Sequence, residues 1–306
     1  MSDWYPAGME DDMRPRMFEA AGRGRPFALV TIVAAEGGGP RGVGAQMVVT
    51  ADDMGGFLSG GCIEADVALH ARECLVDGEP RRLVYGRGSP FVDARLPCGG
   101  RLELLVERLE PADAALIAVR EAWSDRRPGV YVSNGRCRHF GGDRDAGPDA
   151  CRKLYAPPRR LVVFGGDAFA LAIAAAGLWQ GWSVVLCRPK GPEAPPPLAV
   201  TYSREAPEIL LERLGPDAWT AVATATHEGE LDHAVLKAAL LSDAGYVGVL
   251  GARRRLPERL ERLRADGVGE AVLARLKAPI GLAIGARPPA EVATSVTAEI
   301  IAALRS

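Results

Sequence analysis

The sequence lacks a long apolar run, a strong charge of either sign and any closely spaced pair of cysteines. No stretch of about 20 apolar residues occurs, so a transmembrane helix is not expected. The net charge of −2 gives no field that would favour nucleic acid or an anionic membrane surface. The acidic N-terminus, MSDWYPAGMEDDMRPRM, has no apolar core and does not match a secretory signal. We therefore expect a cytoplasmic protein with reduced thiols.

None of the six cysteines belongs to a CxxC motif, so a zinc site built on local spacing is not expected. With 306 residues, of which 48% are hydrophobic, the chain is long enough for two domains with substantial cores. Shifts in composition divide it into four segments. These are an N-terminal extension (1–24), a smaller mixed α/β domain with mostly antiparallel strands (25–110), a helix and linker (111–158) and a Rossmann-like domain (159–306).

Residues 159–306 alternate short apolar runs with longer segments of helical spacing. The strand-like runs include RLVVFGG, SVVLCRP and TAVATATH. Such alternation is typical of βαβ units and predicts a doubly wound parallel sheet. By contrast, residues 111–158 are rich in Gly, Asp, Arg and Pro, and one short hairpin with Asn134-Gly135 at its turn is expected there besides the helix.

The first βα turn of the Rossmann-like domain departs from the dinucleotide-binding pattern. Gly165 is placed as G-x-G-x-x-G requires, but Asp167 occupies the position of the second glycine. A carboxylate about 4 Å from a phosphate costs roughly 4 kcal/mol at an effective dielectric near 20. The next strand ends in Arg188 instead of the usual acid, and an arginine there suits the 2′-phosphate of NADP. The pattern favours a scaffold that does not bind NAD(P) in the standard way, with NADP binding as the alternative.

The segment SGGCIEADV (59–67) places a thiol at a strand-to-helix turn. Gly60 and Gly61 fit a sharp turn, and Cys62 is expected in the first helical turn, where the helix dipole and free N–H groups favour a thiolate. Cys98, in LPCGGRLEL, also adjoins two glycines, so the two thiols could converge on one site. The alternative, which spacing alone favours, is that both are small apolar side chains in tight turns.

Two further features could bind ligands. The loop EGGGPRGVGAQ (36–46) carries Arg41, so its N–H groups and this guanidinium could hold an anion, although a plain surface loop is the alternative. In the Rossmann-like domain, His227 and Arg253 follow strand ends, at the edge where doubly wound sheets bind ligands. A solvated start of a helix is the alternative for Arg253.

Taken together, these motifs resemble those of the XdhC/CoxI family. The resemblance covers residues 25–109 and 157–304, in the expected order. It rests on the segments FALVTIVAAEGGGPRGVGAQM, SGGCIEADV and CGGRLELLVE, followed by RLVVFGG, THEGELD, YVGVLGARRR and PIGLAIGARPPAEVATSVTAEIIA.

The resemblance implies a maturation factor for molybdenum hydroxylases of the xanthine-dehydrogenase type. Such a protein binds molybdenum cofactor, as molybdopterin or in its dinucleotide form, protects it and assists its sulfuration. It then inserts the cofactor into the apo-hydroxylase and turns over no small substrate. The implied partners are the apo molybdenum hydroxylase and a cysteine desulfurase. A homodimer fits this interpretation, because doubly wound domains often pair through their helices.

The resemblance also implies roles for particular residues. Cys62 becomes the thiol that faces the molybdenum of the cofactor, and Cys98 supports it. A soft thiolate is a suitable partner for a molybdenum–sulfur centre. The other implied cofactor contacts are Ser59, Gly60, Gly61, Glu64, Arg41, Gln46, Gly165, His227 and Arg253.

The Rossmann-like domain departs from the family pattern at three places. The usual G-A-G-H turn is GGDA here (165–168), the usual acid after the second strand is Arg188, and the aspartate of the GLDIGA segment is Ala283. These differences argue against standard nucleotide binding, whereas the N-terminal thiol motifs are intact. Three hypotheses remain open: a carrier of molybdenum cofactor, an NAD(P)-dependent oxidoreductase and a non-catalytic docking paralogue.

Overall fold

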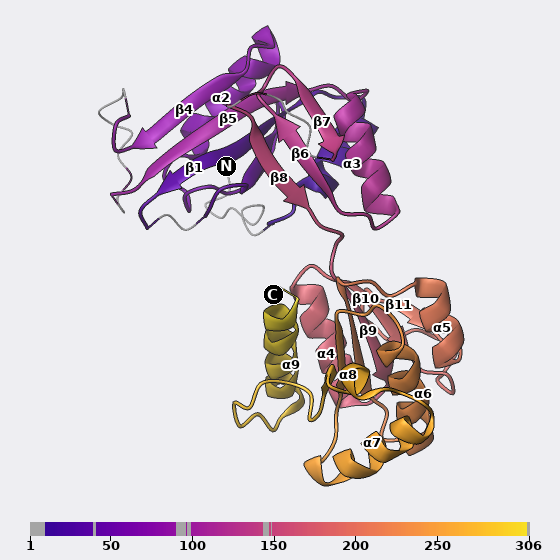
Figure 1. Ribbon diagram of the computed structural model, residues 1–306. Coiled ribbons are helices and arrows are strands. Elements are labelled where there is room, and N and C mark those ends of the chain that lie inside the picture. Colours follow the sequence, from indigo (N-terminus) through magenta and orange to yellow (C-terminus); the bar gives the residue numbers. More distant parts are fainter. Residues whose placement is uncertain are drawn as a thin grey trace. The chain divides into compact units, whose positions relative to one another are not determined.

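The computed structural model describes residues 10–38, 41–89, 96, 99–142, 147 and 149–304. The chain divides into two compact units, Met1–Pro157 and Pro158–Ser306, each with its own sheets and cores (Figure 1). Among the residues described, no helix is long and apolar enough to cross a membrane.

A five-stranded antiparallel sheet in the order β3-β2-β1-β5-β4 forms the centre of the first unit. Its strands are β1 (Phe27–Glu36), β2 (Gln46–Val49), β3 (Met54–Gly56), β4 (Arg81–Gly86) and β5 (Arg101–Leu109). In β1, all residues from 27 to 32 are buried, because alternate side chains enter cores on the two faces of the sheet. The predicted mixed α/β domain with antiparallel pairing is therefore confirmed.

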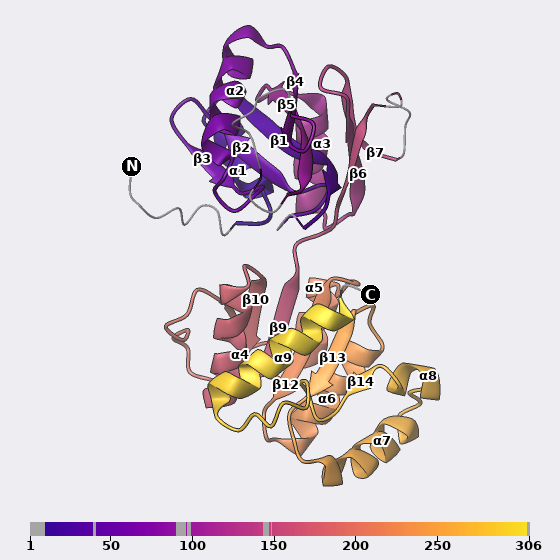
Figure 2. The ribbon, with the colours of Figure 1, turned by 90° about the vertical axis from the view of Figure 1, so that its left-hand side faces the viewer.

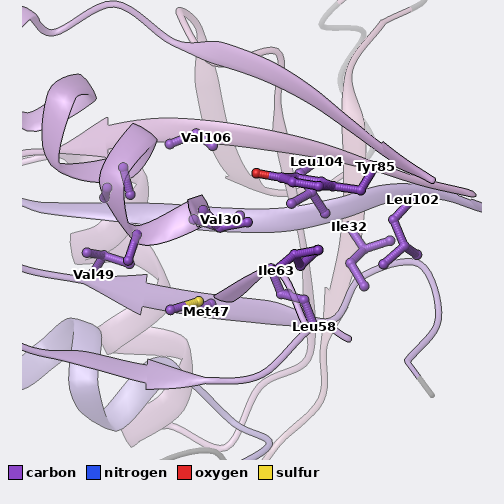
Figure 3. Packing of buried hydrophobic residues seen from close by; sticks show 14 of the residues in the cluster. Val30, Ile32, Met47, Val49, Leu58, Ile63, Tyr85, Leu102, Leu104 and Val106 are labelled. Carbon is purple, nitrogen blue, oxygen red and sulfur yellow. The ribbon is translucent and has the colours of Figure 1, made fainter. Parts of the chain in front are cut away.

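The helix α2 (Glu64–Asp77) covers one face of this sheet. Its buried residues Val67, Ala71 and Cys74 recur every three or four positions, as expected for an amphipathic helix. They pack against the sheet residues that Figure 3 labels, among them Val30. This core lies directly beneath the turn that leads into α2.

The opposite face of the sheet is buried by two helices and a second, smaller sheet. The helices are α1 (Arg14–Gly22) and α3 (Ala114–Ser124). The smaller sheet is antiparallel, in the order β7-β6-β8, and consists of β6 (Gly129–Ser133), β7 (Arg138–Gly141) and β8 (Cys151–Tyr155). Met17 of α1, Phe27 of β1, Leu116 of α3 and Tyr155 of β8 share this core.

The sequence predicts a helix and a linker over residues 111–158. The described residues from 111 to 157 are thus folded into the first unit, and Pro158 begins the second. The helix and the hairpin with Asn134 in its turn are present. The third strand, β8, is not predicted, because its short run combines a partly buried lysine, Lys153, with an exposed leucine, Leu154. A buried charge ties this sheet to the larger one. Glu107 of β5, with no exposed surface, accepts hydrogen bonds from Ser133 at 2.6 Å and from Arg138 at 2.9 Å.

The second unit contains six parallel strands in the order β11-β10-β9-β12-β13-β14. The strands are β9 (Arg160–Gly165), β10 (Ser183–Cys187), β11 (Thr201–Ser203), β12 (Thr220–Ala225), β13 (Tyr246–Val249) and β14 (Leu276–Lys277). The predicted Rossmann-like, doubly wound sheet is confirmed. The strand order reverses between β9 and β12, and the carboxyl ends of these two strands therefore flank the switch point where such domains bind ligands.

Helices cover both faces of this sheet. They are α4 (Ala168–Trp179), α5 (Pro207–Leu214), α6 (Gly229–Leu240), the short η2 (Arg253–Arg255), α7 (Leu256–Ala265), α8 (Glu270–Leu273) and α9 (Pro289–Ala303). One core contains residues of α4 and α9, and the other contains residues of α5 to α8. Figure 1 shows α4 and α9 on one side of the sheet with α5 and α6 on the other, and in Figure 2 α9 runs in front of it.

Candidate functional site

The chain between β3 and α2 wraps around the carboxylate of Glu64. We call residues 58–63 the GGC turn. Glu64 is the first residue of α2, and only 3% of its surface is exposed. The groups that donate hydrogen bonds to its two oxygens, at 2.7 to 3.2 Å, are the backbone N–H groups of Leu58, Ser59, Gly60, Gly61 and Ile63 and the hydroxyl of Ser59. A single carboxylate therefore organises the entire turn.

The Glu64 carboxylate occupies the position that a bound anion would take. Free N–H groups before and within the first helical turn are the usual contacts for a phosphate, and here Glu64 accepts from them. Burial acts to raise the pKa of Glu64, but hydrogen bonds from Ser59 and Leu58 outweigh burial, and the pKa is lowered. Both Glu64 and Ser59, predicted as cofactor contacts, thus have their polar atoms engaged within the turn. Their position is that of groups that hold the GGC turn in shape.

Cys62 lies on the outside of the GGC turn. Since α2 begins at Glu64, Cys62 precedes the helix by two residues instead of lying in its first turn, as the sequence predicts. Gly60 and Gly61 have φ angles of 90° and 110°, which only glycine adopts without strain, and the thiol that follows them is exposed. The interpretation of Cys62 as a small buried side chain is therefore wrong. Cys187 shows the contrast, because it is buried and burial raises the pKa of its thiol to about 12.

The glycine-rich loop adjoins the GGC turn through Arg41. The Cζ atom of Arg41 lies 4.9 Å from the ring centroid of Phe57, the residue directly before the turn. The guanidinium also forms an ion pair with Asp11. The N–H groups of Gly44 and Ala45 are already bonded to backbone carbonyls, so these two do not form the predicted anion-binding nest. Of the described loop residues, Arg41 is the one whose side chain contacts the residue directly before the turn.

The predicted cofactor contact Gln46 is buried within the first unit. Gln46 is 2% exposed, and it donates to Thr31 Oγ1 at 3.1 Å and accepts from the Tyr155 hydroxyl at 2.7 Å. Both ends of its amide are thus satisfied inside the first unit, where they join β1, β2 and β8.

Cys98 lies outside the described residues. Leu96, two residues earlier, belongs to the same core cluster as the GGC turn residues.

At the switch point of the second unit, Asp167 and His227 are in contact. Asp167 follows β9, His227 follows β12, and the His227 Nε2 lies 2.8 Å from Asp167 Oδ2. The other carboxylate oxygen, Oδ1, accepts from the N–H groups of Phe169 and Ala170 at 3.1 and 2.9 Å. His227 has a φ of 60°, an uncommon conformation for a residue other than glycine. The sequence predicts His227 at this edge but not its contact with Asp167.

These residues do not fit a dinucleotide held in the standard way. In that mode the pyrophosphate accepts from N–H groups at the start of the first helix, and in α4 Asp167 accepts from them instead. The side chain of Arg188 also lies across Gly166, since a Cβ added there would be 2.5 Å from Arg188 Cδ. Gly165 is enclosed as well, and an added Cβ would lie 2.5 Å from the carbonyl oxygen of Ala225. At Gly165 the missing side chain allows two strand ends to approach each other.

The remaining predicted residue of this unit, Arg253, is exposed in η2 after β13. Beneath this edge lies a buried carboxylate that sequence reasoning missed. Asp232, 2% exposed, accepts from the hydroxyls of Thr224 and Thr226 at 2.6 and 2.8 Å and pairs with Arg259 of α7 at 2.7 Å. The THEGELD motif contains the acid, but nothing in its spacing indicates a partner on α7. This network fixes the turn between β12 and α6.

Both units match known sequence profiles. The profile of the XdhC and CoxI family matches residues 20–86, and that of the XdhC Rossmann domain matches residues 161–300. The chain is also 30% identical over 288 residues to the molybdenum cofactor insertion chaperone PaoD of Escherichia coli strain K12, which covers 92% of this chain and 85% of PaoD. The chain belongs to the XdhC/CoxI family. Within the family profiles, the GGC turn lies in the first match and the Asp167–His227 pair in the second.

Another relative and a solved structure are also similar to this chain. The XdhC/CoxI chain is 26% identical over 320 residues to a protein of Bacillus subtilis strain 168 that is named as a probable xanthine dehydrogenase component, across 89% of this chain and 92% of that protein. A crystal structure from Bacillus halodurans, described as that of a xanthine dehydrogenase, superposes with a TM-score of 0.75 at 24% identity and covers 95% of both chains. That likeness shows that the two proteins share a fold.

Proposed function

We propose that this protein binds molybdenum cofactor at the GGC turn and delivers it to an apo molybdenum hydroxylase of the xanthine-dehydrogenase type. The observation that carries the proposal is the exposed thiol of Cys62 on a turn that Glu64 holds in shape. This turn lies in the segment that matches the XdhC and CoxI family profile. The 30% identity to a molybdenum cofactor insertion chaperone supports the same cargo.

The chemistry of Cys62 suits a cargo that must be held and then released. A soft thiolate is an appropriate ligand for a molybdenum–sulfur centre. Among the residues described, no group of three or more His, Cys, Asp or Glu side chains is arranged to hold a metal ion. A molybdenum centre bound at Cys62 would therefore keep the ligands it brings and gain one from the protein. One exposed ligand on a pre-formed turn gives a contact that a client protein can replace.

Protection and sulfuration of the cofactor belong to the same proposal. Bound cofactor is protected while Cys62 occupies the open coordination position, and a cysteine desulfurase supplies the sulfur for its sulfuration. The exposed position of Cys62 supports access by both the desulfurase and the hydroxylase. We keep molybdopterin and its dinucleotide form as the two candidate cargoes, and a homodimer as the predicted assembly.

The two alternative functions make different predictions. An NAD(P)-dependent oxidoreductase needs the helix N-terminus that Asp167 already occupies, so the geometry of the second unit disfavours it. A docking paralogue that holds no cofactor predicts that neither Cys62→Ser nor Cys98→Ser changes the activity of the hydroxylase. The carrier hypothesis predicts that at least Cys62→Ser does.

A maturation assay tests the proposal. The apo-hydroxylase is co-expressed with wild-type protein, Cys62→Ser or Cys137→Ser, and its active fraction is measured after purification. Cys137 is a matched control, because it is the other exposed cysteine among the described residues and lies in the β6–β7 turn. We expect wild type and Cys137→Ser to yield active hydroxylase and Cys62→Ser to yield little. Equal activity with all three proteins would contradict the proposal.

A further inference from the structure

A lysine that neither family profile covers reaches the glycine-rich loop. Lys153 of β8 donates a hydrogen bond to the carbonyl of Gly44, and its Nζ lies 5.5 Å from the ring centroid of Tyr155. No carboxylate of the described part of the chain forms an ion pair with Lys153. Burial lowers the pKa of Lys153, and nearby acidic residues offset this only in part. A largely buried cation that no carboxylate of the described chain pairs with is costly, and an anion placed beside it removes that cost.

Arg41 supplies a second cation at the same loop, three residues before Gly44. Within the described residues its ion-pair partner is Asp11, whose side chain is 78% exposed. The Arg41 side chain is 22% exposed, so the pair is open to solvent on its Asp11 side, where a dianion can compete with this single carboxylate. Arg14 also lies near Lys153, but Asp12 binds its guanidinium through both carboxylate oxygens. Arg14 is therefore not a candidate for anion binding.

We propose that Arg41 and Lys153 bind a phosphate monoester of the cargo, and that Asp11 occupies the site until the phosphate displaces it. Arginine presents a planar fork of donors that matches phosphate oxygens, and lysine adds a point charge, so together they suit a dianion. The stacking of Arg41 on Phe57 places this site beside the GGC turn, which carries Cys62. The inference rests on the proposed function, and it assigns the phosphate end of the cargo to the loop and its metal end to the thiol.

Binding of a small phosphate monoester to the cofactor-free full chain tests the site. Glycerol 3-phosphate is titrated at constant ionic strength, set with chloride, and its Kd is obtained from the shift in thermal unfolding. Arg41→Gln and Lys153→Met each remove a charged hydrogen-bond donor, and we expect each to weaken binding by about tenfold or more. Asp11→Asn removes the competing carboxylate and should strengthen binding about threefold. Arg87→Gln and Lys190→Met, at residues 72% and 89% exposed, are matched controls and should bind as wild type does.

The opposite signs of these effects make the result decisive. Absence of glycerol 3-phosphate binding, binding of inorganic phosphate alone, or equal affinity in wild type and Arg41→Gln would each overturn the inference. Asp11 is exposed and Arg41 is partly exposed, so their variants test the site even if Lys153→Met fails to fold. Molybdenum loading, measured on the same proteins, separates the two proposals. Phosphate binding without loading would remove the proposed function and leave the phosphate site, whereas loading without phosphate binding would do the reverse.

Discussion

Glu64→Gln keeps the shape of the side chain but replaces one carboxylate oxygen at the centre of the GGC turn with an amide NH₂ group. An amide nitrogen donates and cannot accept, so the donors that face it lose their partner. If Oε1 remains the oxygen, these are the Ser59 hydroxyl and the N–H groups of Gly61 and Ile63. The Ile63 N–H keeps a second, longer contact with Ser59 Oγ at 3.3 Å, so its loss is partial. A buried donor left unsatisfied costs about 1–3 kcal/mol. Gly61 is exposed and water can replace its partner, so we expect a total loss of about 2–4 kcal/mol in the stability of the turn.

Hydrogen exchange of the peptide that spans the GGC turn measures this loss locally. A loss of about 2–4 kcal/mol corresponds to exchange that is roughly 30-fold to several hundred-fold faster in Glu64→Gln. Glu73→Gln is the matched control on the same helix, because the Glu73 side chain is 60% exposed. It should change stability by no more than about 0.5 kcal/mol. Unchanged exchange in Glu64→Gln, or equal changes in both variants, would refute the role given to Glu64.

The same carboxylate gives the turn a pH dependence of defined sign. The pKa of Glu64 in the folded protein is lower than its ordinary value of 4.5. Its contribution to stability is therefore present above pH 4.5 and is lost as the pH falls through the lower, folded-state pKa. The difference in exchange between wild type and Glu64→Gln should shrink in that acidic range. A difference that stays constant down to the acid limit of folding would contradict this assignment.

Three further substitutions test other parts of the structure. Asp167→Gly restores the second glycine of the dinucleotide pattern and frees the first-turn N–H groups of α4. NADPH should bind this variant in a fluorescence titration but not the wild type, and no binding by either would show that Asp167 alone does not close the site. Gly61→Ala forces a side chain into a φ of 110° and should cost about 1–3 kcal/mol in urea unfolding followed by circular dichroism, whereas an unchanged midpoint would rule out this strain. Arg138→Met leaves the Glu107 carboxylate buried without its cation and should cost about 3–5 kcal/mol in the same assay, and addition of Glu107→Gln should recover part of the loss if the unpaired charge is the cause.

The parts of the fold that the sequence predicts are those with a strong local pattern. The apolar run of β1 and the alternation of strands and helices after residue 159 indicate the two sheets without knowledge of any long-range contact. The strand β8 has no such pattern, because only its end residues, Cys151 and Tyr155, are buried. Its place in the fold depends on pairing with β6, which periodicity does not reveal.

The candidate site, too, is only partly predictable from the sequence. The motif around Cys62 and the loop with Arg41 are evident in the sequence because glycine clusters beside a thiol or a cation are unusual. The contact between Lys153 and Gly44 spans 109 positions of the chain, and no local spacing indicates it. The inward turn of Glu64 is equally hidden, since a carboxylate after a glycine turn can face either a ligand or its own backbone.

Molybdenum and pterin content is the most direct test of the central claim that Cys62 holds the cofactor. Wild type, Cys62→Ser and Cys137→Ser are expressed with an intact molybdenum-cofactor pathway, purified in parallel and assayed for metal and released pterin. The account predicts stoichiometric molybdenum and pterin in wild type and Cys137→Ser, and loss of both from Cys62→Ser. Wild-type protein without molybdenum, or Cys62→Ser with as much molybdenum as wild type, would contradict it.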